Sequence, residues 1–302
     1  MRILLLGADG QLGYELHRAF APLGEVTACT FNGLLPGGLP CARVEFTEDG
    51  ALARLVAEQR PQLVLNAVAH TQVDRAEDEP ALAQRINADA VAELAQACAR
   101  HDAKLVHYST DYVFGGEGAR PWREDDPTAP LGVYGRSKLA GEDAVRASGC
   151  RHMILRTAWL YGARGQNFLR TMLRLAGERE ELRIVADQVG SPTPARWLAG
   201  ATALAQARRP EASGTWHVVA GGGCSWHDFA AAIFAEALTA GLIARVPRLH
   251  AIASAEFAAK ARRPAWSRLD TSRFAGDFGL CLPAWQEGLR QVIGELAERK
   301  AG

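Results

Sequence analysis

The sequence lacks a charge imbalance, a long apolar run and a cysteine cluster, and each absence excludes a class of protein. Over 302 residues, 34 Lys and Arg balance 34 Asp and Glu. A protein that binds nucleic acid through many phosphates needs a basic surface, so we expect no nucleic-acid partner. The chain is 48% hydrophobic and 23% charged, which is typical of a folded core in one large α/β domain or two modest ones.

The apolar run near the start, residues 3–6, ends at Gly7. It is far shorter than the roughly 20 residues of a membrane span or the roughly 7–15 residues of a signal-peptide core. We therefore expect a cytoplasmic protein with no membrane partner. The six cysteines form no CxxC pair or Cys/His cluster, which predicts reduced, mostly buried thiols and neither a disulfide framework nor a zinc site.

The first half of the chain alternates short apolar runs with amphipathic stretches. This alternation is typical of a parallel sheet with helices on both faces, so we predict an α/β fold with a doubly wound parallel sheet. The expected strands are residues 2–6, 25–31, 62–68, 104–109 and 152–158, and the expected helices are 11–23, 51–58 and 81–100.

After residue 158 the pattern becomes looser. Helices are expected at 167–178, 195–207 and 225–240, and strands at 183–185 and 215–219. Because no Gly/Ser/Pro linker separates two halves, we predict a smaller C-terminal substrate domain interleaved with the sheet domain. In this division, residues 1–165 plus about 195–220 form the sheet domain, and about 166–194 plus 221–302 form the substrate domain, which roofs the crevice beyond the carboxyl ends of the strands.

Residues 7–13 (GADGQLG) directly follow the first expected strand and open the first expected helix. In this position Gly7 makes a tight turn, Gly10 lets the backbone approach a pyrophosphate, and Gly13 lets the helix pack closely on the strand. The motif therefore predicts a Rossmann-type dinucleotide-binding domain. The G-x-x-G-x-x-G spacing is typical of the extended short-chain dehydrogenases.

Two further motifs indicate a reductase. Tyr134 and Lys138 form a Y-x-x-x-K pair on one face of an expected helix, where the ammonium favours the phenolate and brings the pKa of about 10 of a free tyrosine towards neutral. Thr110 lies in residues 108–114 (YSTDYVF), at the end of the fourth expected strand. Its hydroxyl can orient a carbonyl for reduction, although alone this stretch would pass as a turn. Together the three residues form a Thr-Tyr-Lys triad.

Four more segments complete a resemblance: residues 66–74 (NAVAHTQVD), 156–162 (RTAWLYG), 187–193 (DQVGSPT) and 262–264 (RRP). With the motifs above, they resemble the dTDP-4-dehydrorhamnose reductases of the extended short-chain dehydrogenase/reductase superfamily. The resemblance implies reduction of the 4-keto group of dTDP-4-dehydro-β-L-rhamnose to dTDP-β-L-rhamnose with NADPH or NADH. This reaction is the last step of dTDP-L-rhamnose biosynthesis, with a dTDP-sugar as the small-molecule partner.

The resemblance also implies roles for individual residues. Tyr134 delivers a proton, Lys138 lowers the pKa of that phenol and holds the nicotinamide ribose, and Thr110 orients the carbonyl. The implied cofactor-binding residues are Gly7, Gly10, Gln11, Leu12, Gly13, Thr30, Glu45, Phe46, Ala69, His70, Thr71, Tyr108, Tyr134 and Lys138. The implied substrate-binding residues are Thr110, Asp111, Trp159, Arg262 and Arg263. Taken without the resemblance, His70, Tyr108 and Trp159 could be core residues, and the two arginines could be solvated charges.

Two positions depart from the family pattern. The family often has an acid at the end of the second strand to hold the adenosine ribose, but this chain has Thr30, which favours NADPH because no carboxylate repels a 2′-phosphate. Some members gather glutamates from two subunits around a divalent cation, and Glu15 and Glu295 match two of those positions. The third is Arg196, which has no lone pair for a metal. We expect no magnesium site and a monomer or weak homodimer, with Glu15 facing solvent or paired with a basic side chain.

Two alternatives remain open at this point. A reductase or epimerase of another nucleotide-linked sugar would carry the same triad, and direct assay of candidate sugars separates these activities. A relative of this fold is a non-catalytic, dinucleotide-binding regulatory subunit of methionine adenosyltransferase. The intact triad argues against that alternative, and turnover by the purified single chain would decide it.

Overall fold

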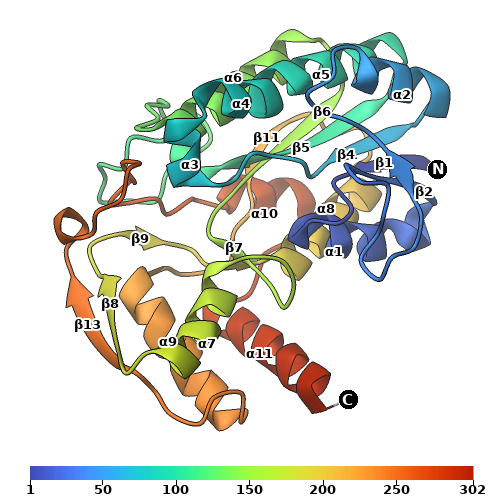
Figure 1. Ribbon diagram of the computed structural model, residues 1–302. Coiled ribbons are helices and arrows are strands. Elements are labelled where there is room, and N and C mark those ends of the chain that lie inside the picture. Colours follow the sequence, from blue (N-terminus) through green and yellow to red (C-terminus); the bar gives the residue numbers. More distant parts are fainter. Residues whose placement is uncertain (302) are drawn as a thin grey trace.

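The computed structural model describes residues 1–301, and its centre is a sheet of seven parallel strands in the spatial order β11-β6-β5-β4-β1-β2-β3. The strands are β1 (Arg2–Leu6), β2 (Glu25–Thr30), β3 (Ala42–Arg43), β4 (Leu63–Asn66), β5 (Lys104–Thr110), β6 (His152–Thr157) and β11 (Gly214–His217). The strand order reverses between β1 and β4, which is where an open α/β sheet binds its ligand. The predicted α/β fold is confirmed (Figure 1).

Helices cover both faces of this sheet. Figure 1 shows α2, α4, α5 and α6 above the strands and α1, α8 and α10 below them. These helices are α1 (Gln11–Phe20), α2 (Ala51–Gln59), α3 (Val73–Asp78), α4 (Pro80–Gln84), α5 (Ala90–Arg100), α6 (Val133–Ala147), α8 (Ala195–Arg208) and α10 (Ser272–Phe278), with short turns of 3-10 helix at Ala21–Leu23, Asp111–Val113 and Ser254–Glu256. Because βαβ connections bury both faces, every residue of β4 and β5 is buried, including the polar residues of β5.

Strand β1 shows how the two cores are separated. Ile3 and Leu5 belong to a cluster formed with α1, α8 and α10, whereas Leu4 and Leu6 belong to a second cluster formed with α2 and α5. All four side chains are at most 1% exposed. The period of two along a strand therefore supplies one hydrophobic residue to each face in turn.

The helix expected at residues 81–100 is divided. Helix α4 ends at Gln84, residues Arg85–Asp89 form a π-helical turn, and α5 begins at Ala90. The turn directs the buried Asn87 amide at the loop after β4: its Oδ1 accepts from the His70 backbone N–H at 2.8 Å, and its Nδ2 donates to the His70 carbonyl at 3.1 Å and to Ser137 Oγ at 3.0 Å. Single π turns often occur at functional sites, and this one clamps a loop of the cavity described below onto α6.

A second region lies below the sheet, around α7 (Phe168–Glu178), α9 (Trp226–Thr239) and α11 (Trp285–Ala301) (Figure 1). Three small two-stranded sheets complete it: β7 (Leu160–Tyr161) with β10 (Thr193–Pro194), β9 (Val189–Gly190) with β12 (Cys224–Ser225), and β8 (Glu181–Val185) with β13 (Arg248–Ile252). Their buried side chains form a core of their own.

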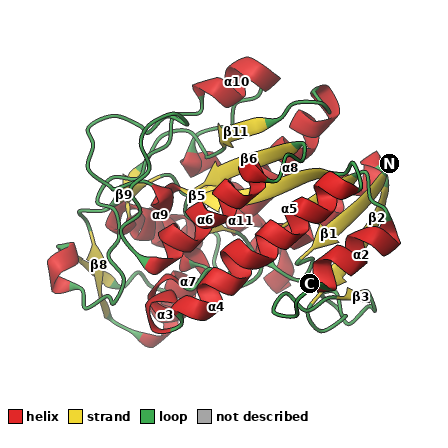
Figure 2. Ribbon diagram, turned by 90° about the horizontal axis from the view of Figure 1, so that it is seen from above, coloured by secondary structure: helices red, strands yellow, loops and turns green. Residues whose placement is uncertain are grey.

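The C-terminal tail contains elements for which the sequence showed no clear period. They are β13, α10 and α11, and α10 packs through Phe274 and Phe278 into the core of the large sheet. This placement differs from the predicted division, which assigns the whole of residues 221–302 to the substrate domain. Helix α10 follows a crossing segment, residues 257–271, that returns the chain to the sheet, and Figure 2 shows α10 beside β11.

Two expectations about the whole chain can be compared with the structure. All six cysteines are free, and Cys29, Cys98, Cys150 and Cys224 are buried, which agrees with reduced core thiols. Among residues 1–301, no helix has the length and apolar character needed to cross a membrane.

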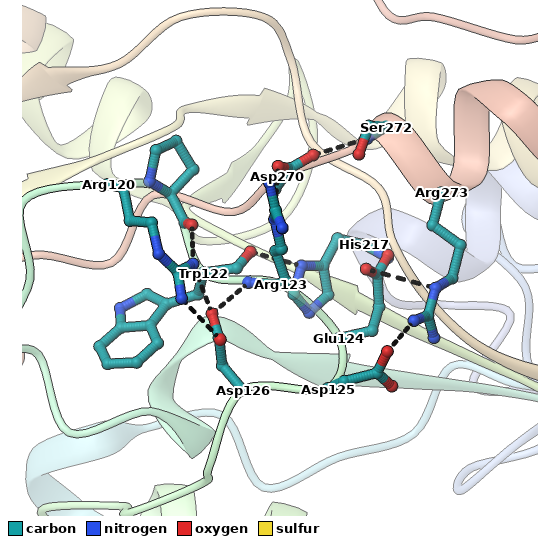
Figure 3. A network of polar contacts seen from close by, with 11 residues as sticks. Arg120, Trp122, Arg123, Glu124, Asp125, Asp126, His217, Asp270, Ser272 and Arg273 are labelled. Carbon is teal, nitrogen blue, oxygen red and sulfur yellow. Dashed lines mark hydrogen bonds and ion pairs between the residues drawn. The ribbon is translucent and has the colours of Figure 1, made fainter.

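A polar network fixes the loop before α6 to the tail of the chain (Figure 3). Asp126 pairs with Arg120 at 2.8 Å, and the Trp122 carbonyl accepts from His217 Nδ1 at 3.0 Å. The backbone of Asp270 donates to the same carbonyl at 2.7 Å. The network therefore holds the crossing segment, which also carries Arg263, against the end of β11.

Candidate active site

A cavity of about 590 Å³ opens at the carboxyl ends of the central strands. Its walls come from the glycine loop, the ends of β4, β5 and β6, the start of α6 and the second region. A second cavity of about 520 Å³ shares Asp9, Gly10, Ala67 and Ala69 with the first and extends past the end of β2. Among the residues predicted to contact cofactor or substrate, Gly13, His70 and Arg262 line neither cavity, and all the others line one or both.

The glycine loop has the geometry that its spacing predicts. Gly7 has φ +78°, in the left-handed region, and donates to the Cys29 carbonyl at 2.9 Å. A Cβ at Gly13 would overlap the Gly7 carbonyl oxygen, so only glycine fits there. Gly10 caps α1 without any side-chain hydrogen bond, and the first turn holds no acidic residue. The first N–H groups of α1 are therefore available to an anion in the cavity.

The second cavity is lined by Phe31, Glu45 and Phe46, with Thr30 at its edge. The Thr30 hydroxyl donates to Asn32 Oδ1 at 3.0 Å and accepts from the Leu34 backbone N–H at 3.0 Å. Its single proton is thus used within the loop after β2, so Thr30 has no donor to spare for a ligand.

Thr110 and Tyr134 meet inside the first cavity. Thr110 ends β5, and its Oγ1 accepts from the Tyr112 backbone N–H at 3.2 Å. Burial raises the pKa of Tyr134 to about 12, and hydrogen bonding with Thr110 opposes that rise. The sequence led us to expect that Lys138 would lower the pKa of Tyr134. Burial of the phenol has the largest effect and raises that pKa, and the Asp111 charge acts in the same direction.

Lys138 is 2% exposed, and burial lowers its pKa to about 8, with the Glu142 carboxylate opposing the change. Its Nζ lies 3.3 Å from His107 Nε2, on the buried strand β5. The sequence motifs did not single out His107. The available signal was the alternation along β5: Tyr108 faces α8, so His107 faces the opposite side of the sheet, towards α6.

Asp111 is buried beside the triad. The Thr110 hydroxyl donates to Asp111 Oδ1 at 2.9 Å, whereas Oδ2 is buried without a hydrogen-bond partner. Burial raises the pKa of Asp111 to about 7, and the nearby hydroxyls of Ser267 and Thr110 oppose the rise. A buried acceptor without a partner lining a cavity is suited to a hydroxyl of the ligand.

Two stacked tryptophans form another wall. Trp159 and Trp226 have ring centroids 3.4 Å apart and planes 5° from parallel, and both line the cavity. Trp159 has φ +45°, a strained backbone conformation for a residue other than glycine. The sequence indicated Trp159 but missed Trp226, which opens α9 far along the chain. Only the contact between the two regions shows that they form one unit.

The structure separates the two neighbouring arginines. Arg263 lines the cavity and pairs with Asp74, with Nη2 to Oδ2 at 2.6 Å and Nη1 to Oδ1 at 3.1 Å. Arg262 is exposed and lines a small separate pocket with Val73. Successive residues of an extended segment point in opposite directions, so only one of the pair faces the cavity.

Three other predicted positions have clear surroundings. Tyr108 lines the cavity, but its hydroxyl donates to Thr202 Oγ1 of α8 at 3.1 Å. His70 contributes its backbone to the Asn87 clamp, and its Nε2 lies 3.6 Å from Glu79. Thr71 and Ala69, on either side, line the cavity.

Glu15 was expected either to face solvent or to pair with a basic side chain, and the structure shows neither. Glu15 is half-buried, and in the part of the chain that the structure describes it makes no ion pair. Burial raises its pKa and Glu295 adds to the rise, while Arg18 and Arg196 oppose it. Glu15, Glu295 and Arg196 therefore lie near one another, as the resemblance implies. The absence of a metal there stays a prediction.

A Rossmann sheet, an open helix N-terminus at the glycine loop and a Thr-Tyr-Lys group in one cavity define an NAD(P)H-dependent reductase of the extended short-chain class. The family model for the RmlD substrate binding domain matches residues 1–298. Reductases for dTDP-4-dehydrorhamnose from Shigella flexneri and Escherichia coli K12 are each 46% identical to the chain over 299 residues, which is 98% of both sequences. The chain therefore belongs to the dTDP-4-dehydrorhamnose reductase family.

Solved structures agree with this assignment. The crystal structure of dTDP-4-dehydrorhamnose reductase from Bacillus anthracis, in complex with NADP, has a TM-score of 0.87 at 36% identity and covers 97% of this chain and 99% of that one. UDP-glucose 4-epimerase from Thermus thermophilus, at 21% identity and a TM-score of 0.78, covers 99% of both chains and shares the fold alone. Membership of the family favours the reductase over the two alternatives.

Proposed function

We propose that this chain reduces the 4-keto group of dTDP-4-dehydro-β-L-rhamnose to dTDP-β-L-rhamnose with NADPH or NADH. The observation that carries the proposal is the meeting of Thr110, Tyr134 and Lys138 in one cavity beside the tryptophan pair, in a chain 46% identical to curated reductases of this substrate. The reaction would be the last step of dTDP-L-rhamnose biosynthesis.

The residues present fit a dinucleotide. The open N-terminus of α1 suits a pyrophosphate, and the close approach at Gly13 brings that helix against the loop. Phe31 and Phe46 offer apolar surface for an adenine, and Lys138 lies at the opposite end, within reach of a nicotinamide ribose. When bound there, the cofactor supplies the hydride that reaches the sugar carbonyl carbon.

The chain's own residues supply the proton and the orientation. A raised pKa keeps Tyr134 protonated at neutral pH, which is the form a proton donor needs. Tyr134 donates that proton to the carbonyl oxygen as it becomes an alcohol. The Thr110 hydroxyl, once it turns from Asp111 Oδ1 to the carbonyl, aligns that oxygen towards Tyr134. We assign Asp111 Oδ2 and the tryptophan pair to the sugar, and Arg263, already turned into the cavity, to the diphosphate.

The assay that tests this function uses the purified chain with dTDP-4-dehydro-β-L-rhamnose and each reduced cofactor, following nicotinamide absorbance. Tyr134→Phe should lower kcat by about 10²–10⁴-fold and leave the cofactor Kd nearly unchanged, because it removes one proton donor and little contact area. Wild-type turnover by that variant would contradict the role of Tyr134. Turnover of another nucleotide-linked sugar in place of this one would contradict the substrate.

The cofactor preference follows from the end of β2. We infer that NADPH is used at least as well as NADH. Thr30 replaces a repelling carboxylate, and Arg43 of β3, which is paired with Thr30, has its guanidinium 5.9 Å from the Phe31 ring. Thr30→Asp should shift the kcat/KM ratio towards NADH by about tenfold, the equivalent of about 1.4 kcal/mol. Thr30→Asn, which alters the loop without adding charge, is the control. An equal shift in both variants would show that charge at this position does not set the choice.

We also infer that catalysis needs no magnesium and that the chain is a monomer or a weak homodimer. The support is chemical: the Arg196 guanidinium beside Glu15 brings positive charge and no lone pair to the place where a third oxygen ligand would be needed.

A further inference from the structure

A line of buried polar groups leads from the backbone of Val68 to the amine of Lys138. The Val68 N–H lies 3.2 Å from Asn66 Oδ1, Asn66 Nδ2 lies 3.2 Å from His107 Nδ1, and His107 Nε2 lies 3.3 Å from Lys138 Nζ. Asn66, His107 and Lys138 are 1%, 0% and 2% exposed. Asn66 and His107 line neither cavity, so their hydrogen bonds must be satisfied by protein neighbours, whereas Lys138 also faces the first cavity.

The direction of the line is set at its backbone end. The N–H of Val68 can only donate, so Asn66 Oδ1 must face it and accept. The amide NH₂ of Asn66 is then left facing His107 Nδ1, and an NH₂ group can only donate. Reversing the amide would place two donors against each other at Val68. His107 Nδ1 is therefore the acceptor and carries no proton.

His107 presents an N–H to Lys138. Burial lowers the pKa of His107 well below its usual range, with the neighbouring Lys138 charge adding to the effect, so the imidazole is neutral. A neutral imidazole holds one proton, and with Nδ1 excluded that proton is on Nε2. An ammonium has donors only, whereas a neutral amine has a lone pair. The contact between His107 and Lys138 is a hydrogen bond only when Lys138 is the neutral amine.

We propose that His107 is a positioning residue that donates its Nε2–H to the lone pair of the Lys138 amine and so favours the neutral amine over the ammonium. The inference rests on the proposed function for its role in turnover, but its geometry does not. It means that the proton on Lys138 is weakly held, so that the Lys138 and Tyr134 pair can lose and regain a proton close to neutral pH.

The charged groups around Lys138 act in both directions. Glu142, on the next turn of α6, favours the ammonium, but it is itself held in a buried ion pair by Arg156 of β6 and is also paired with Arg146. Tyr134 shares the cavity with Lys138, and Asp111 acts on Tyr134. The pKa of about 8 for Lys138 shows that burial outweighs the Glu142 charge, and the His107 N–H acts in the same direction as burial.

The direct test is the tautomer of His107. The full-length chain, with ¹⁵N-labelled histidine, is examined by long-range ¹H–¹⁵N correlation at neutral pH, and the signals are assigned by their loss in His107→Gln. We expect the proton on Nε2. His217 is an internal reference, because its Nδ1 faces the Trp122 carbonyl at 3.0 Å and must carry the proton. A proton on Nδ1 of His107 would overturn the proposal, whatever the enzyme's activity.

A functional test reverses the direction of the hydrogen bonds along this line. Asn66→Asp offers a carboxylate that accepts from both Val68 N–H and His107, so the proton should move to Nδ1 and leave Nε2 as an acceptor for an ammonium. The basic limb of the kcat/KM profile should move up by about 1 pH unit or more. The same substitution in a His107→Phe background controls for the charge alone and should shift the limb by less than half as much. An equal shift in both backgrounds would contradict the proposal. Failure of the wild-type chain to turn over the sugar would contradict the proposed function instead, and the tautomer of His107 would still decide this proposal.

Discussion

Two buried cations lie on neighbouring parts of the same scaffold and have opposite surroundings. Arg156 of β6 is held by Glu142 of α6 through two bonds, Nε to Oε1 at 2.9 Å and Nη2 to Oε2 at 2.7 Å. Lys138, one turn earlier on α6, has no carboxylate within ion-pair distance among residues 1–301. A buried charge without a partner costs stability, so its retention indicates a function, whereas the paired charge is structural.

Each cation also faces a buried histidine, and the two histidines have opposite polarity. His217 donates from Nδ1 to the Trp122 carbonyl (Figure 3). Its Nε2, which lies 3.5 Å from Arg156, therefore accepts. Burial and the Arg156 charge lower the pKa of His217 to about 3. His107, ordered from a backbone N–H instead of a carbonyl, presents a donor to Lys138. The backbone group at the start of each chain of hydrogen bonds, a carbonyl for His217 and an N–H for His107, therefore decides whether the imidazole accepts from the neighbouring cation or donates to it.

The largest difference between the two cations should appear on replacing Lys138. Lys138→Met should lower kcat/KM by about 10²–10⁴-fold and weaken cofactor binding, because the amine serves both the tyrosine and the ribose. The free energy of unfolding at pH 7 should stay the same or rise, since an apolar chain of similar length replaces an unpaired buried ammonium. Enzyme kinetics and urea denaturation measure the two. A loss of several kcal/mol in stability would show that Lys138 is a structural residue after all.

Breaking the ion pair between Arg156 and Glu142 should have the opposite effect, a large loss of stability with a small loss of turnover. Glu142→Gln leaves Arg156 buried without a carboxylate and should lower the free energy of unfolding by about 3–5 kcal/mol. The kcat of the remaining folded protein should fall much less than in Lys138→Met. Arg146→Ala is the matched control, because Arg146 also pairs with Glu142 but has a side chain 37% exposed, where an ion pair contributes about 0–1 kcal/mol. Equal destabilisation by both variants would contradict the comparison.

The pH dependence of the free energy of unfolding should also distinguish Lys138 from Arg156. The pKa of Lys138 is about 8 in the folded chain and 10.5 for the ordinary side chain. Between these values the unfolded chain binds more protons, so the Lys138 contribution to stability rises with pH, by about 3 kcal/mol in all, and is constant below pH 8. The free energy of unfolding of the wild type should therefore rise relative to that of Lys138→Met as the pH is raised from 7 to 10.5. A constant difference would mean that Lys138 titrates normally.

Much of the architecture could be predicted from local patterns. The strands expected at 2–6, 104–109 and 152–158 agree with β1, β5 and β6 to within a residue, because each contains a short apolar run between helical patterns. The tail was not predicted: α10 is only seven residues long, and it packs on the core of the large sheet, whereas α11 packs on the core of the second region. The π turn at Arg85–Asp89 was not predicted either, because a shift from one helical period to another over five residues leaves no signal in the apolar pattern.

The sequence alone determined the features that depend on neighbours along the chain. These are the left-handed turn at Gly7, the spacing that puts Tyr134 and Lys138 on one helix face, and the placing of Thr110 at a strand end. Only the tertiary structure decided which distant groups meet: His107 with Lys138, Glu142 with Arg156, and Trp226 with Trp159. The physical reason is that turns and helix faces follow from local sterics. The protonation of a buried group depends instead on the burial, charges and hydrogen-bond directions that surround it after the chain has crossed the sheet.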